Sequence, residues 1–463
     1  MIDTLKFDTI CAPATGNGGA ISIIRISGNK AISIVDSVFR AKKKDFKLSD
    51  SESHQLHFGD ILDHESVLDE VLVTVFKDKK SYTGEPSIEL SLHASPYILQ
   101  KTLELLIQQG ARMAEPGEFS MRAFLNGKLD LAQAEAVADI IASSSKSSHL
   151  TAMKQLKGEF SNRLKTLRQQ LMDFASLIEL ELDFSEEDVE FADRAKFIEL
   201  VSEIKKEVEQ LIHSYKIGHV LKNGIPVAIV GKPNVGKSTL LNALLQEDKA
   251  IVSDIAGTTR DVIEDVISIE GVLYRFIDTA GIRKSEDLIE SLGIERTYQK
   301  IEEANIVLFL LDANEISSAD DIEKQIELAR LNINTEEQQL IVVLNKIDQS
   351  PLPDSLIDTD FQWVGISAKS HHNLHALEGA LNQYVQQFGI EDQSIVTNAR
   401  HQEALQHTQS SLLTILEAYE NGISTDLIAI DVRTALYYLG TITGQIGTDE
   451  LLGNIFGRFC IGK

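Results

Sequence analysis

The chain has 463 residues, of which 43% are hydrophobic and 25% are charged. These ordinary globular values exclude a wholly disordered protein, and the length predicts two or three domains rather than one. The 70 acidic residues outnumber the 44 basic ones and give a formal net charge of −26. Such acidity disfavours a general, non-specific nucleic-acid-binding protein, while it still allows RNA to bind at a local basic patch or through a partner subunit.

Targeting and redox signals are sparse in this sequence. It holds no run of 18 apolar residues, so we expect no membrane span. The first eight residues, Met1 to Asp8, lack a basic segment followed by an apolar one, so we expect no secretory signal. Cys11 and Cys460 lie at opposite ends of the chain, which predicts neither a disulfide framework nor a cysteine metal site. A cytoplasmic protein fits these features.

Residues 1–125 are expected to form an α+β domain. The β-branched segments 20–26 and 70–76 predict strands, and the glycine-rich residues 16–19 predict a turn before the first of them. Residues 96–109 predict a helix.

From Asn126 to residue 223 the sequence predicts long helices, because apolar residues recur at helical spacing from Leu129. A second helix is expected at 194–215. Between the two, residues 179–190 hold seven carboxylates and no basic residue, which we interpret as a solvated helix end and loop rather than a metal site.

Residues 224–386 alternate short apolar runs with helical patterns, which predicts a doubly wound α/β domain. The expected strands are 227–230, 273–277, 306–311, 340–344 and 363–366. Residues 387–463 return to helices, expected at 405–419 and 431–439. The ends of an inserted domain usually lie close together, so the two helical tracts are expected to pack as one domain around the insertion.

The strongest motif is a phosphate-binding loop. Gly231-Lys232-Pro233-Asn234-Val235-Gly236-Lys237-Ser238 follows an expected strand and opens an expected helix at Thr239, which is the context that this motif requires. Glycines let backbone N–H groups approach the phosphates, Lys237 neutralises their charge, and the Ser238 hydroxyl binds Mg²⁺.

Three further motifs follow in the order of a small GTPase domain. Asp278-Thr279-Ala280-Gly281 can reach Mg²⁺ and the γ-phosphate, and Ser367-Ala368-Lys369 can cover the base. In Asn345-Lys346-Ile347-Asp348, a buried carboxylate at Asp348 would accept the N1–H and amino protons of guanine. Adenine lacks that pair of donors, so the motif selects GTP over ATP.

Two positions depart from the Ras pattern. Ile282 stands where Ras-like enzymes place the glutamine that orients water, so another group must do so. The Asn234 oxygen could hold a monovalent cation beside the phosphates, or the side chain could merely brace the loop by hydrogen bonds. Switch I is expected at Ser253-Asp254-Ile255-Ala256-Gly257-Thr258-Thr259, where Thr259 completes the Mg²⁺ shell.

Four segments outside these motifs give a resemblance that covers nearly the full length. They are Arg25-Ile26-Ser27-Gly28, Ser81-Tyr82-Thr83-Gly84-Glu85, the segment from Asn126-Gly127-Lys128 to Ala136, and the last five residues, Phe459-Cys460-Ile461-Gly462-Lys463. Together they resemble the MnmE (TrmE) family of tRNA-modification GTPases.

The resemblance implies an N-terminal domain that binds folate and dimerises, a discontinuous helical domain, and an inserted GTPase domain. It also implies a homodimer that forms a heterotetramer with the flavin-dependent MnmG (GidA). Together they add an aminomethyl or carboxymethylaminomethyl group to carbon 5 of the wobble uridine of certain tRNAs. The implied one-carbon donor is 5-formyl- or 5,10-methylene-tetrahydrofolate.

The family's functional residues carry over motif by motif. The resemblance implies folate contacts at Arg25, Glu85, Lys128 and Lys463. It implies K⁺ bound by the Asn234 and Thr258 side chains with the carbonyls of Ser253 and Ile255.

The remaining implied roles concern catalysis. Glu290 would position the attacking water, although it also suits the start of a helix. Cys460 is a candidate catalytic thiol, although a buried structural cysteine fits it equally well. A second function class stays open, because a GTP-gated assembly or ribosome-binding switch would carry the same GTPase motifs. The N-terminal and C-terminal segments favour the tRNA-modifying enzyme.

Overall fold

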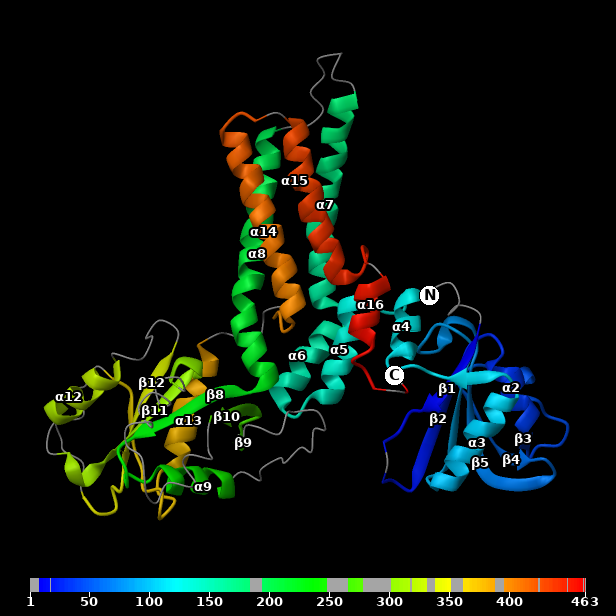
Figure 1. Ribbon diagram of the computed structural model, residues 1–463, viewed down its shortest axis with the longest axis horizontal. Coiled ribbons are helices and arrows are strands. Elements are labelled where there is room, and N and C mark those ends of the chain that lie inside the picture. The colour runs from blue at the N-terminus through cyan, green and yellow to red at the C-terminus, as the bar shows by residue number, and fades with distance from the viewer. Residues whose placement is uncertain are drawn as a thin grey trace. The chain divides into compact units, whose positions relative to one another are not determined.

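The computed structural model describes most of the chain in two compact units (Figure 1). The described residues are 8–16, 18–183, 194–247, 265–277, 301–316, 319–330, 338–350, 361–387, 395–423, 425–447, 449–460 and 462. One unit holds residues 1–138, 155–202 and 407–463, and the other holds 139–154 and 203–406. The domain boundaries expected at 125, 223 and 386 remain predictions.

A seven-stranded sheet forms the centre of the first unit, in the order β3-β4-β5-β6-β2-β1-β7. Neighbouring strands are antiparallel except β1 and β7, which are parallel. The strands are β1 Thr9–Pro13, β2 Ile21–Ser27, β3 Phe39–Ala41, β4 Gln55–Asp63, β5 Ser66–Phe76, β6 Ser87–His93 and β7 Ala111–Met113. Short 3₁₀ helices lie at η1 Leu48–Asp50 and η2 Asp78–Lys80.

Helices α2 Ala31–Val38 and α3 Pro96–Gln108 pack on one face of this sheet, and α4 Glu118–Leu125 follows β7. Because side chains alternate along a strand, the inward residues Ile24, Ile26 and Val73 join the apolar core with the two helices. The expected α+β domain, both of its strands and its helix are therefore confirmed. Its helix ends at Gln108, one residue before the expected end.

The helices expected after Asn126 are present but divided. They are α5 Leu131–Ala142, α6 Lys146–Leu156, α7 Glu159–Asp183 and α8 Arg194–Asn223, followed late in the chain by α14 Ala399–Glu420, α15 Thr425–Thr443 and α16 Asp449–Phe456. In the first unit α7 packs along α15. Stacked rings join α7 to α8 at Phe174 and Phe197, 4.3 Å apart, and α14 to α15 at His407 and Tyr438, 4.5 Å apart. The contact of α7 with α15 shows that the early and late helical tracts pack together in this unit. The acidic segment begins within α7, and its residues 184–190 lie outside the described part.

A six-stranded sheet forms the centre of the second unit, in the order β13-β12-β11-β8-β10-β9. All neighbours are parallel except β10 and β9. Its elements are β8 Ile225–Gly231, α9 Lys237–Glu247, β9 Asp265–Ile269, β10 Val272–Phe276, β11 Ile306–Asp312, η4 Ala313–Glu315, α12 Ala319–Arg330, β12 Gln339–Asn345, β13 Trp363–Gly365 and α13 Leu374–Gln386.

Both faces of this sheet are covered, as a doubly wound fold requires. On β12, Ile341 and Val343 pack with α9 and α13, whereas Val342 and Leu344 pack with α12. The predicted α/β domain is confirmed, and each of its five expected strands corresponds to a strand of the sheet. The antiparallel strand β9 was not expected.

Candidate functional site

The phosphate-binding loop connects β8 to the start of α9, at the carboxyl edge of the parallel strands. Gly236 has φ +103°, and a Cβ placed on it would lie 2.3 Å from Asn345 Nδ2. A glycine is therefore needed here both for the left-handed backbone and for the close approach of Asn345. Ser238 and Thr239 follow on the first turn of α9.

Lys237 lies at the start of α9 and bends back over the loop. Its Nζ donates hydrogen bonds to the backbone oxygens of Gly231 at 2.6 Å and Lys232 at 2.8 Å. Burial lowers the pKa of the Lys237 ammonium group, because water solvates the charged form better than the protein does. An ammonium group near a loop of backbone N–H groups can bind phosphate oxygens.

Asn345 connects three of the expected GTP motifs. Its side chain is buried, with Nδ2 donating to the Val235 oxygen at 2.8 Å and Oδ1 accepting from the backbone N–H groups of Lys346 at 2.9 Å and Ala368 at 3.0 Å. The phosphate loop, the base motif and the segment Ser367-Ala368-Lys369 are therefore fixed to one amide. The sequence placed these motifs at strand ends, and the structure brings them together.

The base-binding side of the site is more open than the sequence suggested. Ser367 and Ala368 are buried, but Asp348 is exposed, so the expectation of a buried carboxylate is wrong for the protein alone. The cause is its position, since Lys346, Ile347 and Asp348 form a turn beyond the end of β12. The Asp348 carboxylate is accessible to a ligand there.

Asn234 lies at the tip of the phosphate loop with φ +64° and is exposed. Its backbone oxygen accepts from Lys346 Nζ at 3.0 Å, and its side chain makes no hydrogen bond to any residue that the structure describes. Among the described residues, none therefore holds the Asn234 side chain in place by a hydrogen bond. The described residues also contain no group of three or more histidine, cysteine, aspartate or glutamate residues that could hold a metal ion.

Several expected GTP and metal residues lie outside the described part of the chain. They are Ser253, Asp254, Ile255, Ala256, Gly257, Thr258, Thr259, Asp278, Thr279, Ala280, Gly281 and Glu290. Ile282 and the terminal Lys463 also lie outside it.

Arg25 marks a second candidate site, on β2 of the first unit. Its guanidinium lies over the rings of Tyr82 at 5.4 Å and Phe119 at 5.7 Å, and its Nη2 lies 2.8 Å from Glu89 Oε1. Arg25 is therefore half-buried beside two aromatic rings rather than a free surface charge. Sequence reasoning assigned no role to either ring, although Tyr82 belongs to the segment that runs from Ser81 to Glu85.

The C-terminal motif returns to this same site. The backbone oxygen of Gly462 accepts from Arg25 Nη1 at 3.4 Å, and a Cβ on Gly462 would lie 2.0 Å from the oxygen of Pro13. Glycine is required at position 462 because its φ is +98° and because its backbone lies against Pro13, the last residue of β1. Cys460 is exposed rather than buried, and its backbone oxygen accepts from the Gly117 N–H at 3.3 Å. The alternative of a buried structural cysteine at 460 is therefore wrong.

Glu85 lies in the loop between β5 and β6 and contacts β2. Ser27 Oγ donates to Glu85 Oε2 at 2.9 Å, and Arg122 Nη1 lies 3.1 Å from the same oxygen. Ser27 is two residues from Arg25, so both side chains project from the same face of β2. Arg122 was missed by sequence reasoning, since two of its three carboxylate partners, Asp8 and Glu85, are distant in the sequence.

Lys128 is exposed and follows α4. Its Nζ donates to the Lys79 oxygen at 3.0 Å, and its Cγ lies 3.1 Å from where a Cβ on Gly84 would stand. Lys128 is therefore adjacent to the loop that carries Glu85. Arg25, Glu85 and Lys128 were selected from three separate segments, and the structure gathers them around one loop and one strand.

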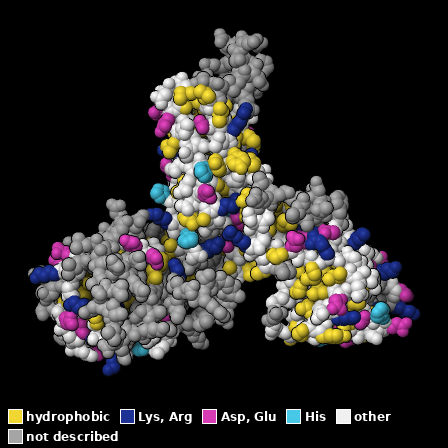
Figure 2. Space-filling view, in the orientation of Figure 1, with side chains coloured by type: hydrophobic (Ala, Val, Ile, Leu, Met, Phe, Trp, Pro, Cys, Tyr) yellow, Lys and Arg dark blue, Asp and Glu magenta, His cyan; other side chains and the backbone are white. Residues whose placement is uncertain are grey.

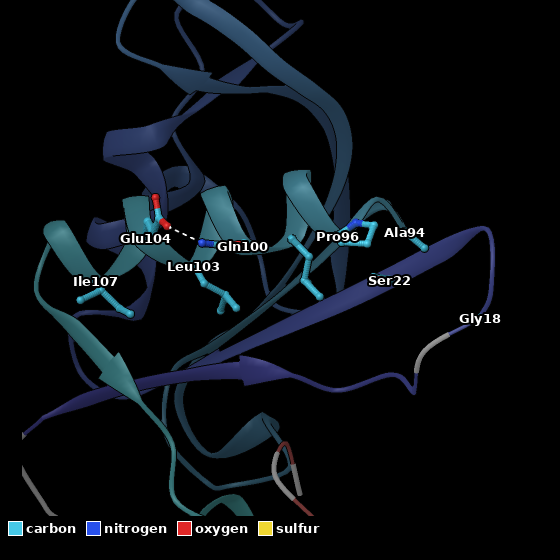
Figure 3. Close-up of a pocket in the computed structure, with 9 residues that line it drawn as sticks. Gly18, Ser22, Ala94, Pro96, Gln100, Leu103, Glu104 and Ile107 are labelled. Atoms are coloured by element: carbon cyan, nitrogen blue, oxygen red, sulfur yellow. Dashed lines mark hydrogen bonds between the residues drawn. The ribbon is translucent and has the colours of Figure 1, made fainter.

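A pocket of about 640 Å³ lies elsewhere in the first unit, beside α3 (Figure 3). Hydrophobic side chains gather over the part of the molecule where α3 lies (Figure 2). The lining residues are Gly18, Ser22, Ala94, Pro96, Leu99, Gln100, Leu103, Glu104 and Ile107. None of them was expected to bind GTP, a metal ion or folate.

No helix in the described part of the chain is long and apolar enough to span a membrane.

Two family models match the chain. The model of the MnmE helical domain matches residues 131–460, and that of the GTP-binding protein TrmE N-terminus matches residues 9–128. The first match extends across the α/β domain, as expected if that domain interrupts a helical one.

Curated relatives match over nearly the whole length. The tRNA modification GTPase MnmE of Flavobacterium johnsoniae is 50% identical, covering 98% of this chain and 99% of its own. That of Christiangramia forsetii is also 50% identical, with the same coverage. A crystal structure of an Era variant from Aquifex aeolicus, bound to GDP and AlF₄⁻, is 31% identical over 41% of this chain and 66% of its own, with a TM-score of 0.26.

Proposed function

The chain belongs to the MnmE family of tRNA modification GTPases, and we propose that it couples GTP hydrolysis to modification of carbon 5 of the wobble uridine in certain tRNAs. The group added is aminomethyl or carboxymethylaminomethyl. The flavin-dependent partner is of the MnmG (GidA) type, and the one-carbon donor is 5-formyl- or 5,10-methylene-tetrahydrofolate.

One observation carries this proposal. Gly462, in the C-terminal motif, contacts Arg25 near the other end of the chain, at 3.4 Å. A GTP-gated assembly switch gives no reason for the C-terminal motif to return to an aromatic-lined arginine 437 residues earlier in the chain. A folate site does, because folate combines a flat pterin ring with an anionic glutamate tail.

The residues of the GTP site fit their ligand. The backbone of Asn234, Val235 and Gly236 would hold the phosphates with Lys237, and Asp348 would accept the guanine donors. Ser238 would hold Mg²⁺ together with Thr259, and the metal ion would neutralise charge that develops on the phosphates.

A monovalent cation is the second proposed ion. The exposed Asn234 side chain has no partner among the described residues, so its oxygen is available to K⁺. Thr258 and the carbonyls of Ser253 and Ile255 would complete the site. K⁺ would supply positive charge next to the phosphates, which Ras-related enzymes obtain from an arginine.

The residues near Arg25 fit a folate. The Glu85 carboxylate suits the donor-rich edge of a pterin, and the Tyr82 and Phe119 rings offer flat apolar contact. Arg25, Lys128 and the terminal Lys463 supply positive charge for the glutamate tail.

Partners follow from the same family membership. The face of the N-terminal sheet opposite α2 and α3 exposes Leu56, Phe58 and Leu72, each at least 40% accessible. An exposed apolar sheet face of this kind supports a homodimer through that domain. We propose that the homodimer acts in the cytoplasm on tRNA, as a heterotetramer with the MnmG-type partner.

Mass spectrometry of tRNA from a deletion strain tests this function directly. Loss of the modified wobble uridine is expected, with recovery when the wild-type chain is restored and no recovery with Asp348→Asn. Unchanged wobble uridines in the deletion strain would reject the modification role and favour the GTP-gated switch.

A further inference from the structure

We propose that Arg122 is a positioning residue of the folate site, whose guanidinium fixes the Glu85 carboxylate as the acceptor for the 2-amino group of the pterin ring. This inference rests on the proposed function, since it concerns the same ligand. Nothing in the sequence motifs assigns a role to Arg122.

The guanidinium of Arg122 is the centre of a buried ionic cluster. Its side chain is only 2% exposed, yet it contacts three carboxylates. Nη2 lies 2.6 Å from Asp8 Oδ1 and 2.9 Å from Glu118 Oε1, while Nη1 lies 3.1 Å from Glu85 Oε2 and 3.3 Å from Glu85 Oε1. Arginine is suited to this because its planar group presents five N–H donors in a fixed fork.

The cluster contains more negative than positive charge. Arg112 contacts Asp8 and Glu118, so two arginines face three carboxylates when Glu85 is included. Glu118 is fully buried and bound by both arginines, whereas the Glu85 side chain is 15% exposed and contacts only Arg122 among the described cations. Glu85 is therefore the carboxylate whose charge is least neutralised and which a ligand can still reach.

Glu85 is also held from its other side. Ser27 Oγ donates to Oε2 at 2.9 Å, and Ser27 is itself 2.7 Å from Thr83 Oγ1. Within the described residues, Oε1 accepts only the longer contact from Arg122, at 3.3 Å. A carboxylate oxygen has about two acceptor positions, so Oε1 can accept a further N–H.

The alternative is that Arg122 only stabilises the domain. A buried arginine with three carboxylates certainly affects folding, because removing one member of a buried pair leaves an uncompensated charge. If the role of Arg122 were purely structural, its substitution would weaken the binding of all folates equally. If Arg122 positions Glu85, its substitution would weaken the binding of only those folates that carry the 2-amino group.

Arg112 provides a matched control. It belongs to the same cluster and shares Asp8 and Glu118 with Arg122, but it makes no contact with Glu85 in the described structure. Lysine keeps the charge at either position, but its single ammonium nitrogen cannot reproduce the fixed geometry of the guanidinium, in which Nη1 of Arg122 binds Glu85 while Nη2 binds Asp8 and Glu118.

The experiment titrates the full-length protein with 5-formyl-tetrahydrofolate and with its 2-desamino-2-methyl analogue, using calorimetry. The wild type is expected to prefer the natural ligand by about tenfold or more, the usual size of one hydrogen bond to a charged group. Arg122→Lys and Glu85→Gln should each reduce that preference towards one. Arg112→Lys should preserve it, even if its unfolding temperature falls.

Two outcomes separate this inference from the function on which it rests. If the wild type binds no 5-formyl-tetrahydrofolate, the folate function fails and this inference fails with it. If the wild type binds and Arg122→Lys keeps the full preference, only the positioning role is overturned. Should Arg122→Lys not fold, the double variant Glu118→Gln with Arg122→Gln replaces a buried ion pair by neutral amides and must show the same loss of preference.

Discussion

Lys346 Nζ lies 2.6 Å from Asp312 Oδ2 and 3.0 Å from the backbone oxygen of Asn234. Burial alone would raise the pKa of the Asp312 carboxyl, but hydrogen bonds from Lys346 and Asn314 outweigh it and hold that pKa below its usual range. The lysine of the base motif is therefore fixed between the end of β11 and the tip of the phosphate loop. The segment proposed to bind guanine and the phosphate loop are therefore joined through this one side chain.

Asp312→Asn should weaken guanine nucleotide binding by about tenfold, because the amide keeps the shape but loses the charge that holds Lys346. Titration with a fluorescent GDP analogue measures the effect. Glu315→Gln is the matched control, since the Glu315–Lys232 pair at 3.3 Å is more than half exposed on both sides and should contribute little. Equal affinity for wild type and Asp312→Asn would contradict this role.

Gly236→Ala should abolish GTP binding while leaving the domain folded. The new methyl group would lie 2.3 Å from Asn345 Nδ2 at a φ of +103°, so Asn345 would have to leave the Val235 oxygen. Gly379→Ala, within α13, meets no atom within 4 Å and should stabilise the domain by roughly 0.5–1 kcal/mol. Nucleotide titration and thermal unfolding of both variants test this contrast, and normal GTP affinity in Gly236→Ala would refute it.

The sequence predicted the parallel strands well, because long apolar runs between helical patterns have few other interpretations. It missed β9, which joins β10 through Glu270 and Gly271, both with positive φ. A two-residue hairpin with that backbone usually contains Asn-Gly or Asp-Gly, so a Glu-Gly turn gave only a weak signal.

In the candidate sites too, the sequence indicated residues that belong to local motifs and missed a residue that depends on contacts distant in the sequence. Lys237 and Asp348 were identifiable because each belongs to a motif with fixed spacing. Arg122 was not, because a lone arginine in an amphipathic helix usually lies on the surface, and its partners Asp8 and Glu85 are 114 and 37 residues away. Which charges become buried is decided by tertiary packing, which one sequence does not reveal.

The two cysteines should differ strongly in reactivity. Burial raises the pKa of the Cys11 thiol to about 11, so only about one molecule in a thousand would carry the reactive thiolate at pH 8. Cys460 is exposed. Iodoacetamide at pH 8 should therefore label Cys460 in the native protein and Cys11 only after unfolding in urea. Peptide mass spectrometry measures both sites, and equal native labelling would show that Cys11 is accessible.

GTP hydrolysis should be faster in K⁺ than in Na⁺ at equal ionic strength, and Asn234 should be responsible for the difference. The backbone conformation of Asn234 decides which substitution can test its role in K⁺ stimulation. Asn234 has φ +64°, where alanine is strained by about 1–2 kcal/mol. Asn234→Ala would therefore lose the cation ligand and distort the loop together.

Asn234→Gly separates these two effects, because glycine adopts a positive φ without strain and has no side-chain oxygen. It should keep nucleotide binding, since the backbone oxygen that accepts from Lys346 remains, but lose the advantage of K⁺ over Na⁺. Asn234→Asp retains an oxygen ligand and should keep part of that advantage. Glu290→Ala should lower turnover in both salts alike, because its proposed role concerns water rather than the ion. Steady-state rates across matched KCl and NaCl series provide the measurement. A wild type with equal rates in both salts would exclude the cation site, and an Asn234→Gly variant that still prefers K⁺ would place the ion elsewhere.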